Sequence, residues 1–162
     1  MYSKDYLIRL IEQFFHAIAA IIYKIEQRDF AVAQAEIEAA YKRFYGLPAA
    51  LVHKMTLESV IQFVVDRQES AGQERLRMLA EILAADGELQ ALRGNEAAAS
   101  RRSRRALELF HYLDPACDSE QSGTTRRLIL NTAGRAAKAE IAPEILKWLN
   151  QLEQQDADKN GR

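Results

Sequence analysis

The chain has 162 residues, a length typical of one domain with a single hydrophobic core. Hydrophobic residues make up 48%, and 3 prolines and 7 glycines are too few for an all-β fold, so the composition favours helices. The formal net charge of -1, from 22 basic and 23 acidic residues, provides no overall field that would attract a polyanion. A single cysteine, Cys117, excludes an intramolecular disulfide and a cysteine-only metal site.

The first predicted helix covers residues 3–27 and has an unusually wide apolar face. Its main stripe at helical spacing consists of Leu7, Ile11, Phe14, Ile18, Ile21 and Ile25. Ile8, Phe15 and Ile22 widen this stripe to about half of the circumference, whereas a helix packed on one neighbour needs about 100°. Either the C-terminal helices or another chain must cover the surplus. We therefore assign a candidate partner or dimer interface to Ile8, Phe15, Ile18 and Ile22.

The N-terminal segment does not have the features of a membrane span or a signal peptide. Its most apolar run, residues 14–23, contains His16 and is about half as long as the roughly 20 residues that cross a bilayer. Charges of both signs precede this run, and no small-residue cleavage site follows it. We expect a cytoplasmic protein without membrane contact, and the lone cysteine agrees with a reducing compartment.

The next elements are shorter and have distinct boundary residues. A helix over 30–45 has Asp29 as its predicted N-cap and Gly46 as the residue that ends it. Pro48 can begin a short helix that runs to residue 54. Thr56 can cap another helix that runs to residue 67.

The C-terminal half predicts four further helices. The first covers residues 69–93 with an interruption at Asp86-Gly87, and its partner covers residues 96–113. The last two cover residues 119–139 and 143–152, and the final apolar stripe consists of Ile145, Trp148, Leu149 and Leu152. We therefore expect one domain over residues 1–155 and a frayed polar tail over residues 156–162.

An internal repeat relates the two halves. Residues 27–44 align without a gap over residues 93–110, at an offset of 99 − 33 = 66 residues. The matched pairs are Ala33 with Ala99, Ala40 with Ala106, Phe44 with Phe110, and the turn residue Asp29 with Asn95. This offset is close to two periods of roughly 34 residues, the length of a tetratricopeptide helix pair.

Residues 85–115, ADGELQALRGNEAAASRRSRRALELFHYLDP, resemble a tetratricopeptide repeat. The matching positions are Gly87 in the first helix, Gly94 in the turn, Ala99 and Ala106 in the second helix, and Asp114-Pro115 near the terminal proline. The family's bulky aromatic positions hold Leu83, Gln90 and Ser103, and in the earlier copy Ile21 replaces Gly87. The resemblance implies an all-α fold of antiparallel hairpins in a right-handed array, here of about seven helices. It also implies that Ala99 and Ala106 pack on the helix that contains Gly87.

Four arginines lie within residues 101–105 and have two possible interpretations. On a helical wheel Arg101, Arg104 and Arg105 oppose the face of Ala99 and Ala106, so we expect a solvated outer face on which the four arginines are mostly exposed. The alternative is a surface for nucleic acid or another polyanion formed by Arg101, Arg102, Arg104, Arg105, Arg126, Arg127 and Arg135. The balanced net charge makes a nucleic-acid partner the weaker expectation.

The sequence contains no recognisable catalytic or metal-binding motif. There is no glycine-rich phosphate loop or paired-cysteine cluster. Glu108 and His111 have the Glu-x-x-His spacing of di-iron bundles, but no second such pair exists. We expect His16 and His53 to be ordinary surface or boundary residues. The sequence therefore predicts no catalytic residue, metal or cofactor, and we do not expect an enzyme.

The leading functional hypothesis is a non-catalytic module that binds a protein, a peptide or a second copy of itself. The resemblance supports this hypothesis, because first helices line the groove of tetratricopeptide arrays and Phe15, Ile18 and Ile22 fall on that side. The order of the elements, and residues 46–63, GLPAALVHKMTLESVIQF, also resemble an uncharacterised bacterial family of small helical proteins. That second resemblance implies no activity.

Overall fold

A computed structural model describes residues 4–65, 71–117 and 123–161. Within these ranges every regular element is helical, which confirms the predicted all-α class. The described elements are α1 (Lys4–Glu26), α2 (Phe30–Tyr45), α3 (Ala49–Lys54), α4 (Leu57–Val65), α5 (Gly72–Leu92), α6 (Glu96–Leu113), α7 (Gly123–Ala133), the short 3-10 helix η1 (Lys138–Glu140) and α8 (Pro143–Asn160).

The predicted boundary residues act as expected at several helix ends. Gly46 ends α2 in the left-handed conformation, with φ of 68°, which glycine adopts without the steric cost of a Cβ. Thr56 caps α4, because the Ser59 amide donates to its Oγ1 at 3.1 Å. Asp29 occupies the N-cap position of α2 without a side-chain hydrogen bond there.

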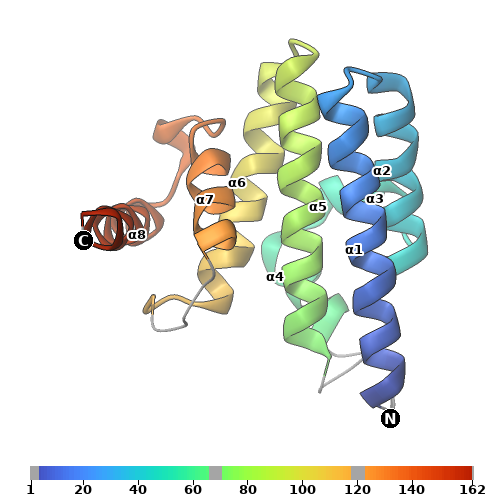
Figure 1. The fold of residues 1–162 in the computed structure, drawn as a ribbon, viewed down its shortest axis with the longest axis horizontal. Helices are drawn as coiled ribbons and strands as arrows, with labels where there is room; N and C mark the ends of the chain where they lie inside the picture. The colour runs from blue at the N-terminus through green and yellow to red at the C-terminus, as the bar shows by residue number, and fades with distance from the viewer. Residues whose placement is uncertain (1–3, 66–70, 118–122, 162) are drawn as a thin grey trace.

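The helices form hairpins that lie side by side (Figure 1). α1 packs on α2 to form one hairpin, and α5 packs on α6 to form the other. α5 lies between the first hairpin and α6, and it also contacts α4 and α7. Within each hairpin the two helices run antiparallel, as predicted. α8 departs from this pattern, because Figure 1 shows it nearly end-on while α5 and α6 run along the page. The short helices α3 and α4 are inserted between the two hairpins in the sequence and pack mainly on α2, α5 and α6.

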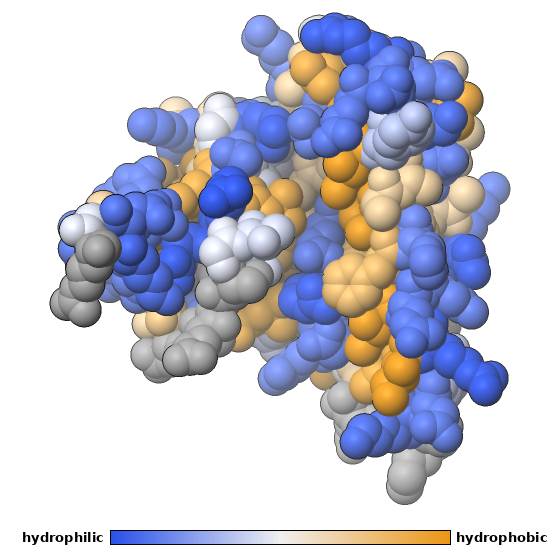
Figure 2. All heavy atoms as spheres, in the orientation of Figure 1, coloured by the Kyte–Doolittle hydropathy of each residue, from blue (hydrophilic) through white to orange (hydrophobic). Residues whose placement is uncertain are grey.

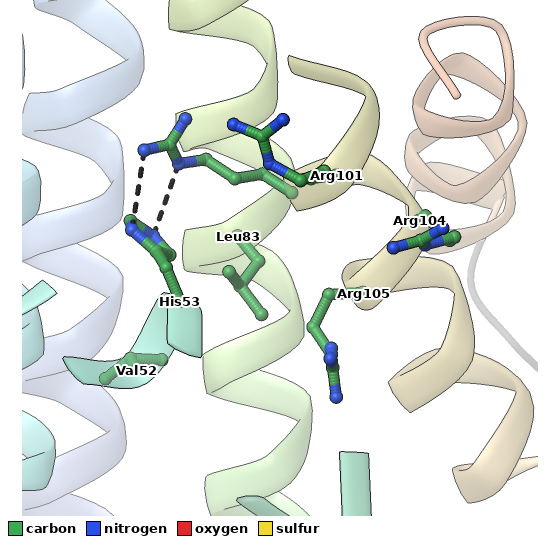
Figure 3. Close-up of a pocket in the computed structure, with 7 residues that line it drawn as sticks. Val52, His53, Leu83, Arg101, Arg104 and Arg105 are labelled. Atoms are coloured by element: carbon green, nitrogen blue, oxygen red, sulfur yellow. Dashed lines mark hydrogen bonds between the residues drawn. The ribbon is translucent and has the colours of Figure 1, made fainter. Parts of the chain in front are cut away.

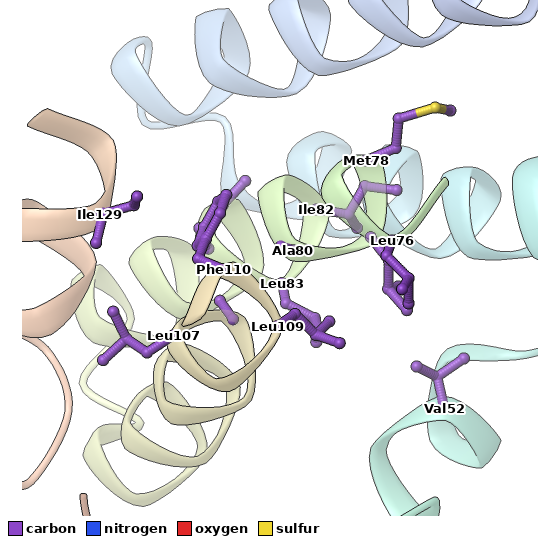
Figure 4. Close-up of a cluster of buried hydrophobic side chains, with 14 of the residues drawn as sticks. Val52, Leu76, Met78, Ala80, Ile82, Leu83, Leu107, Leu109, Phe110 and Ile129 are labelled. Carbon is purple, nitrogen blue, oxygen red and sulfur yellow. The ribbon is translucent and has the colours of Figure 1, made fainter. Parts of the chain in front are cut away.

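The core is centred on α5, which is apolar around most of its circumference. Figure 4 shows Leu76, Ile82 and Leu83 of α5 near Leu109 and Phe110 of α6, and all five side chains are buried. Burial on several sides requires apolar residues in every direction, so α5 has no continuous polar face.

Asp86 and Gly87 do not interrupt α5, so the predicted break in this helix is wrong. Gly87 lies within the helix and allows a close approach of α6. A Cβ on Gly87 would lie 2.5 Å from Ser103 Oγ and 3.4 Å from the carbonyl oxygen of Ala99. Ala99 and Ala106 are both buried, as expected, and the contact with Gly87 places Ala99 at the interface of these helices.

The C-terminal helix ends differ from the prediction. The expected helix over 119–139 is α7, which ends at Ala133, and a turn at Gly134 then leads to η1. Its first expected residues, 119–122, lie outside the described residues. α8 continues to Asn160, so residues 156–160 belong to a helix and not to a frayed tail. The polar residues of this last part include good helix formers, which explains why it remains helical without an apolar stripe.

Candidate functional site

The first candidate site is an apolar stripe on α1, which Figure 2 shows on the face toward the viewer. Ile8, Phe15 and Ile22 are 45%, 50% and 42% exposed, and they follow one another at intervals of seven positions. Ile11 and Ile18 lie beside them and are half-buried. We call these five residues the α1 seam. The possibility that the C-terminal helices cover this surplus is wrong, because the seam remains accessible in the folded chain.

The opposite side of α1 holds the helix in the fold. Phe14, Ile21 and Ile25 are buried, and the rings of Phe14 and Phe44 meet edge to face with their centroids 5.7 Å apart. Leu10, which the sequence prediction left out of the stripe, is also buried. The main neighbours of α1 are α2 and α5. One part of the wide apolar face of α1 is therefore buried in the core, and the seam on the other part remains accessible to solvent.

Length and composition alone would allow α1 to cross a membrane. Phe14, Ile21 and Ile25 nevertheless lie in the protein core, so a crossing would require α1 to leave α2 and α5.

The second candidate site is a pocket of about 110 Å³ between α3 and α6. Val52 and His53 come from α3, Leu83 comes from α5, and α6 contributes Arg101, Arg102, Arg104 and Arg105. Figure 3 shows Leu83 near the centre, with His53 and the labelled arginines around it. We call this hollow the arginine pocket. All four arginines of the 101–105 run line it.

A buried carboxylate lies beside the arginine pocket. Asp86 is completely buried, and its Oδ2 lies 2.9 Å from Nε of Arg102 and 3.2 Å from Nε2 of His53. The Tyr41 hydroxyl donates to the same oxygen at 3.1 Å, and Gln90 Nε2 donates to Oδ1 at 3.2 Å. A buried carboxylate needs such partners to offset its lost hydration. Four elements, α2, α3, α5 and α6, meet at this one group.

The network extends from Asp86 toward the end of α5. Gln90 also donates to Gln34 Oε1 at 2.9 Å, and Asn95 Nδ2 donates to Gln90 Oε1 at 2.9 Å. Burial, followed by the neighbouring negative charge of Asp86, raises the pKa of Tyr41 well above its ordinary value. Tyr41 therefore stays protonated and remains a hydrogen-bond donor to Asp86.

The structure corrects the expectation that the four arginines are mostly exposed. Arg101 is exposed, but Arg102, Arg104 and Arg105 are half-buried. Arg104 lies 3.6 Å from Glu108 and 3.5 Å from Glu140, whereas Arg102 pairs with Asp86. The physical reason is that α3 and the segment at η1 cover parts of the arc that the helical wheel left open.

The other arginines of the polyanion alternative have separate environments. Arg126 is buried, with Nη1 3.8 Å from Asp156 of α8, and Arg135 lies 3.6 Å from Glu88 of α5. Arg127 is exposed on α7. Carboxylates thus already neutralise part of this set.

The histidines also have defined environments. His53 lies at the Asp86 network and its ring meets Tyr41 edge to face, so it has a larger structural role than predicted. His111 packs edge to face on Trp148, while Glu108 pairs with Arg104. His16 is exposed. Cys117 is half-buried, with Sγ 3.8 Å from Oε1 of Gln151.

Sequence reasoning missed the connection between Asp86 and Arg102, although the helical spacing indicated it. Asp86 follows Ile82 by four residues and precedes Leu89 by three, so it lies among buried positions of α5. Arg102 follows Ala99 by three residues and therefore borders the core face of α6.

Comparison with known proteins found no matching family model, curated protein or solved structure.

Proposed function

We propose that this protein is a non-catalytic interaction module that binds an amphipathic helix along the α1 seam. The observation that carries this proposal is the exposure of Ile8, Phe15 and Ile22 at successive intervals of seven residues. An apolar side chain every seventh residue keeps a packed helix in contact along the whole length of the seam. Ile11 and Ile18 supply the second row of such an interface.

The arrangement of the hairpins supports a tetratricopeptide-like array. α2 begins at Phe30 and α6 at Glu96, so their starts differ by 96 − 30 = 66 residues, the offset of the internal repeat. α5 packs on both helices of the preceding hairpin, as the first helix of a stacked pair does. Gly87 and Ala99 provide the close contact between the two helices of the second pair. In such an array the first helices, here α1 and α5, form the binding side. Because α5 is mostly buried in the core, α1 supplies the exposed apolar surface.

The occupant that the seam fits best is α1 of a second copy. Phe15 is seven residues from both Ile8 and Ile22, so the seam is symmetric about its central aromatic side chain. A two-fold axis near Phe15 places Ile8 of one copy against Ile22 of the other, with the two helices antiparallel. Burial of apolar area contributes roughly 25 cal/mol per Å² before the costs of association are subtracted.

Sedimentation velocity over a wide range of protein concentrations tests this proposal. We expect a monomer–dimer equilibrium for the unmodified chain and a folded monomer for Phe15→Asp, because a carboxylate in the seam would lose its hydration on association. Gln13→Asp is the matched control, since Gln13 is an exposed polar residue of α1 outside the seam. It should associate like the unmodified chain.

Two results would contradict self-association through the seam. One is a strict monomer at every concentration, and the other is equal loss of association in both aspartate variants. If the monomer instead binds lipid vesicles in a manner that requires Phe15, the seam is a membrane contact and the dimer proposal is wrong.

A further inference from the structure

The arginine pocket contains cationic groups that the fold does not neutralise. Arg102 pairs with Asp86, and Arg104 pairs with Glu108 and Glu140. Among the described residues, neither Arg101 nor Arg105 has a carboxylate within ion-pair distance. Nη1 of Arg105 is also buried without a hydrogen-bond partner in this part of the chain. Such an atom indicates a site where an acceptor is missing.

The positions of these arginines on α6 increase the local repulsion. Arg101 and Arg105 are four residues apart, and Arg101 and Arg104 are three residues apart. Like charges at these spacings repel each other on a helix, and Figure 3 shows the side chains of Arg101 and Arg105 extending in opposite directions, to different sides of Leu83. An anion bound in the pocket would reduce that repulsion and would give Nη1 of Arg105 the acceptor that it lacks.

The shape of the pocket fits a compact anion better than an extended chain. Figure 3 shows Arg101, Arg104 and Arg105 on different sides of Leu83, and Val52 and His53 of α3 form the opposite wall. Both ring nitrogens of His53 lie close to the Arg102 guanidinium, at 3.2 and 3.4 Å, so the imidazole helps to position that side chain. The hollow of about 110 Å³ is lined by the charged arginines, by His53 and by the aliphatic side chains of Val52 and Leu83.

We propose that the arginine pocket binds a phosphate group carried by a small ligand, with Arg105 as its principal contact and with Arg101 adding positive charge on the other side of Leu83. A phosphate offers several oxygens to guanidinium groups that approach from different directions. A carboxylate, in contrast, can pair fully with one guanidinium group through two parallel hydrogen bonds. This site is independent of the α1 seam and does not require the chain to associate. Arg102 remains paired with Asp86 and contributes positive charge at the wall.

Calorimetric titration with inorganic phosphate tests the site, with acetate and chloride at matched ionic strength as comparison anions. We expect saturable binding of phosphate, and a thermal midpoint that rises with its concentration, because a ligand that binds the folded state stabilises it. Acetate should bind more weakly and chloride should give no saturable signal. The double variant Arg101→Gln/Arg105→Gln should bind phosphate at least roughly tenfold more weakly.

The matched control is Arg127→Gln, because Arg127 is an exposed arginine on α7 outside the pocket. It should retain the affinity of the unmodified chain, and so should Gln13→Asp on α1, because Gln13 is an exposed residue that does not line the pocket. Arg101→Gln alone serves as a second test, since an exposed side chain can be replaced without loss of folding. It should weaken the binding of phosphate.

Three outcomes would overturn the proposal. The first is phosphate affinity that is unchanged in the folded double variant. The second is equal stabilisation by chloride at the same ionic strength, which would indicate general screening of charge. The third is salt-dependent retention on heparin that falls equally with Arg127→Gln and with the double variant, since this would indicate a diffuse polyanion surface.

Discussion

Nε of Arg102 lies 2.9 Å from Oδ2 of Asp86 across the interface of α5 and α6. Asp86 is fully buried, while the Arg102 side chain is 19% exposed. The guanidinium is therefore the main compensating charge for a carboxylate that has no contact with solvent. Tyr41 and Gln90 supply hydrogen bonds to the same group. The pair fixes the position of α6 against α5 and connects both helices to α2.

Removal of Arg102 should destabilise the fold much more than removal of its neighbour. Arg102→Gln leaves the Asp86 carboxylate buried without its charged partner, which costs about 3–5 kcal/mol in the free energy of unfolding. Arg101→Gln should cost less than about 1 kcal/mol, because Arg101 is exposed. Urea denaturation measures both values. Similar small losses in the two variants would show that Asp86 does not depend on Arg102. The double variant Arg102→Gln/Asp86→Asn should recover part of the stability.

Gly87→Ala should destabilise the protein although alanine is the better helix former. The new Cβ would lie 2.5 Å from Ser103 Oγ and 3.3 Å from the Ser103 amide nitrogen, so the Ser103 side chain or α6 itself must shift. Such overpacking costs about 1–3 kcal/mol, against a gain of at most about 1 kcal/mol in helix propensity. Thermal and urea unfolding measure the net effect. Combination with Ser103→Ala removes the closest atom and should restore part of the loss. An increase in stability for Gly87→Ala alone would contradict the close contact.

Adjacent phenylalanines of α1 should respond very differently to truncation. Phe14 is 1% exposed and packs on Phe44, so Phe14→Ala should cost about 3–5 kcal/mol. Phe15 is 50% exposed, so in dilute protein Phe15→Ala should change the free energy of unfolding by less than about 1 kcal/mol. Denaturant unfolding at low protein concentration compares the two. Equal losses would place Phe15 in the core and remove the basis of the seam.

Glu81 should make the stability depend on pH. Burial raises its pKa above the ordinary value, although Arg77 at 3.3 Å acts in the opposite direction. A carboxyl with a raised pKa in the folded state favours folding at low pH. This contribution is lost as the pH rises from the ordinary glutamate range through the folded pKa. Glu81→Gln should therefore be more stable than the unmodified chain at neutral pH and should lose that advantage in acid. A constant difference across the pH range would exclude this cause.

The helix order follows from the sequence where turn residues and apolar spacing agree. The predicted spans 30–45 and 96–113 match α2 and α6, because Asp29 and Gly46 bound one helix and Asn95 and Asp114 bound the other. The end of α8 was predicted too early. Residues 153–160 carry no apolar stripe, and their helical structure depends on propensity and on continuation from the buried Leu152.

The candidate sites were predictable to different degrees. The surplus apolar width of α1 indicated the seam, because the width of a stripe can be compared with what one neighbour covers. The arginine pocket was missed because its other wall is α3, a short helix whose position depends on tertiary packing. The burial of Asp86 was missed because a polar residue beside a glycine was interpreted as a break in the helix. Its apolar neighbours at helical spacing were the better guide.

The position of Asp86 between the two hairpins affects how the protein unfolds. In an array of stacked hairpins each unit contacts only its neighbours, so the ends can open while the middle stays folded. Here Tyr41 and His53 from the N-terminal half and Arg102 from the C-terminal half share one buried carboxylate. Separation of the halves would leave that charge without compensation. The amide protons of α2, α5 and α6 should therefore exchange with solvent together, as one cooperative unit, while those at the far end of α8 exchange earlier.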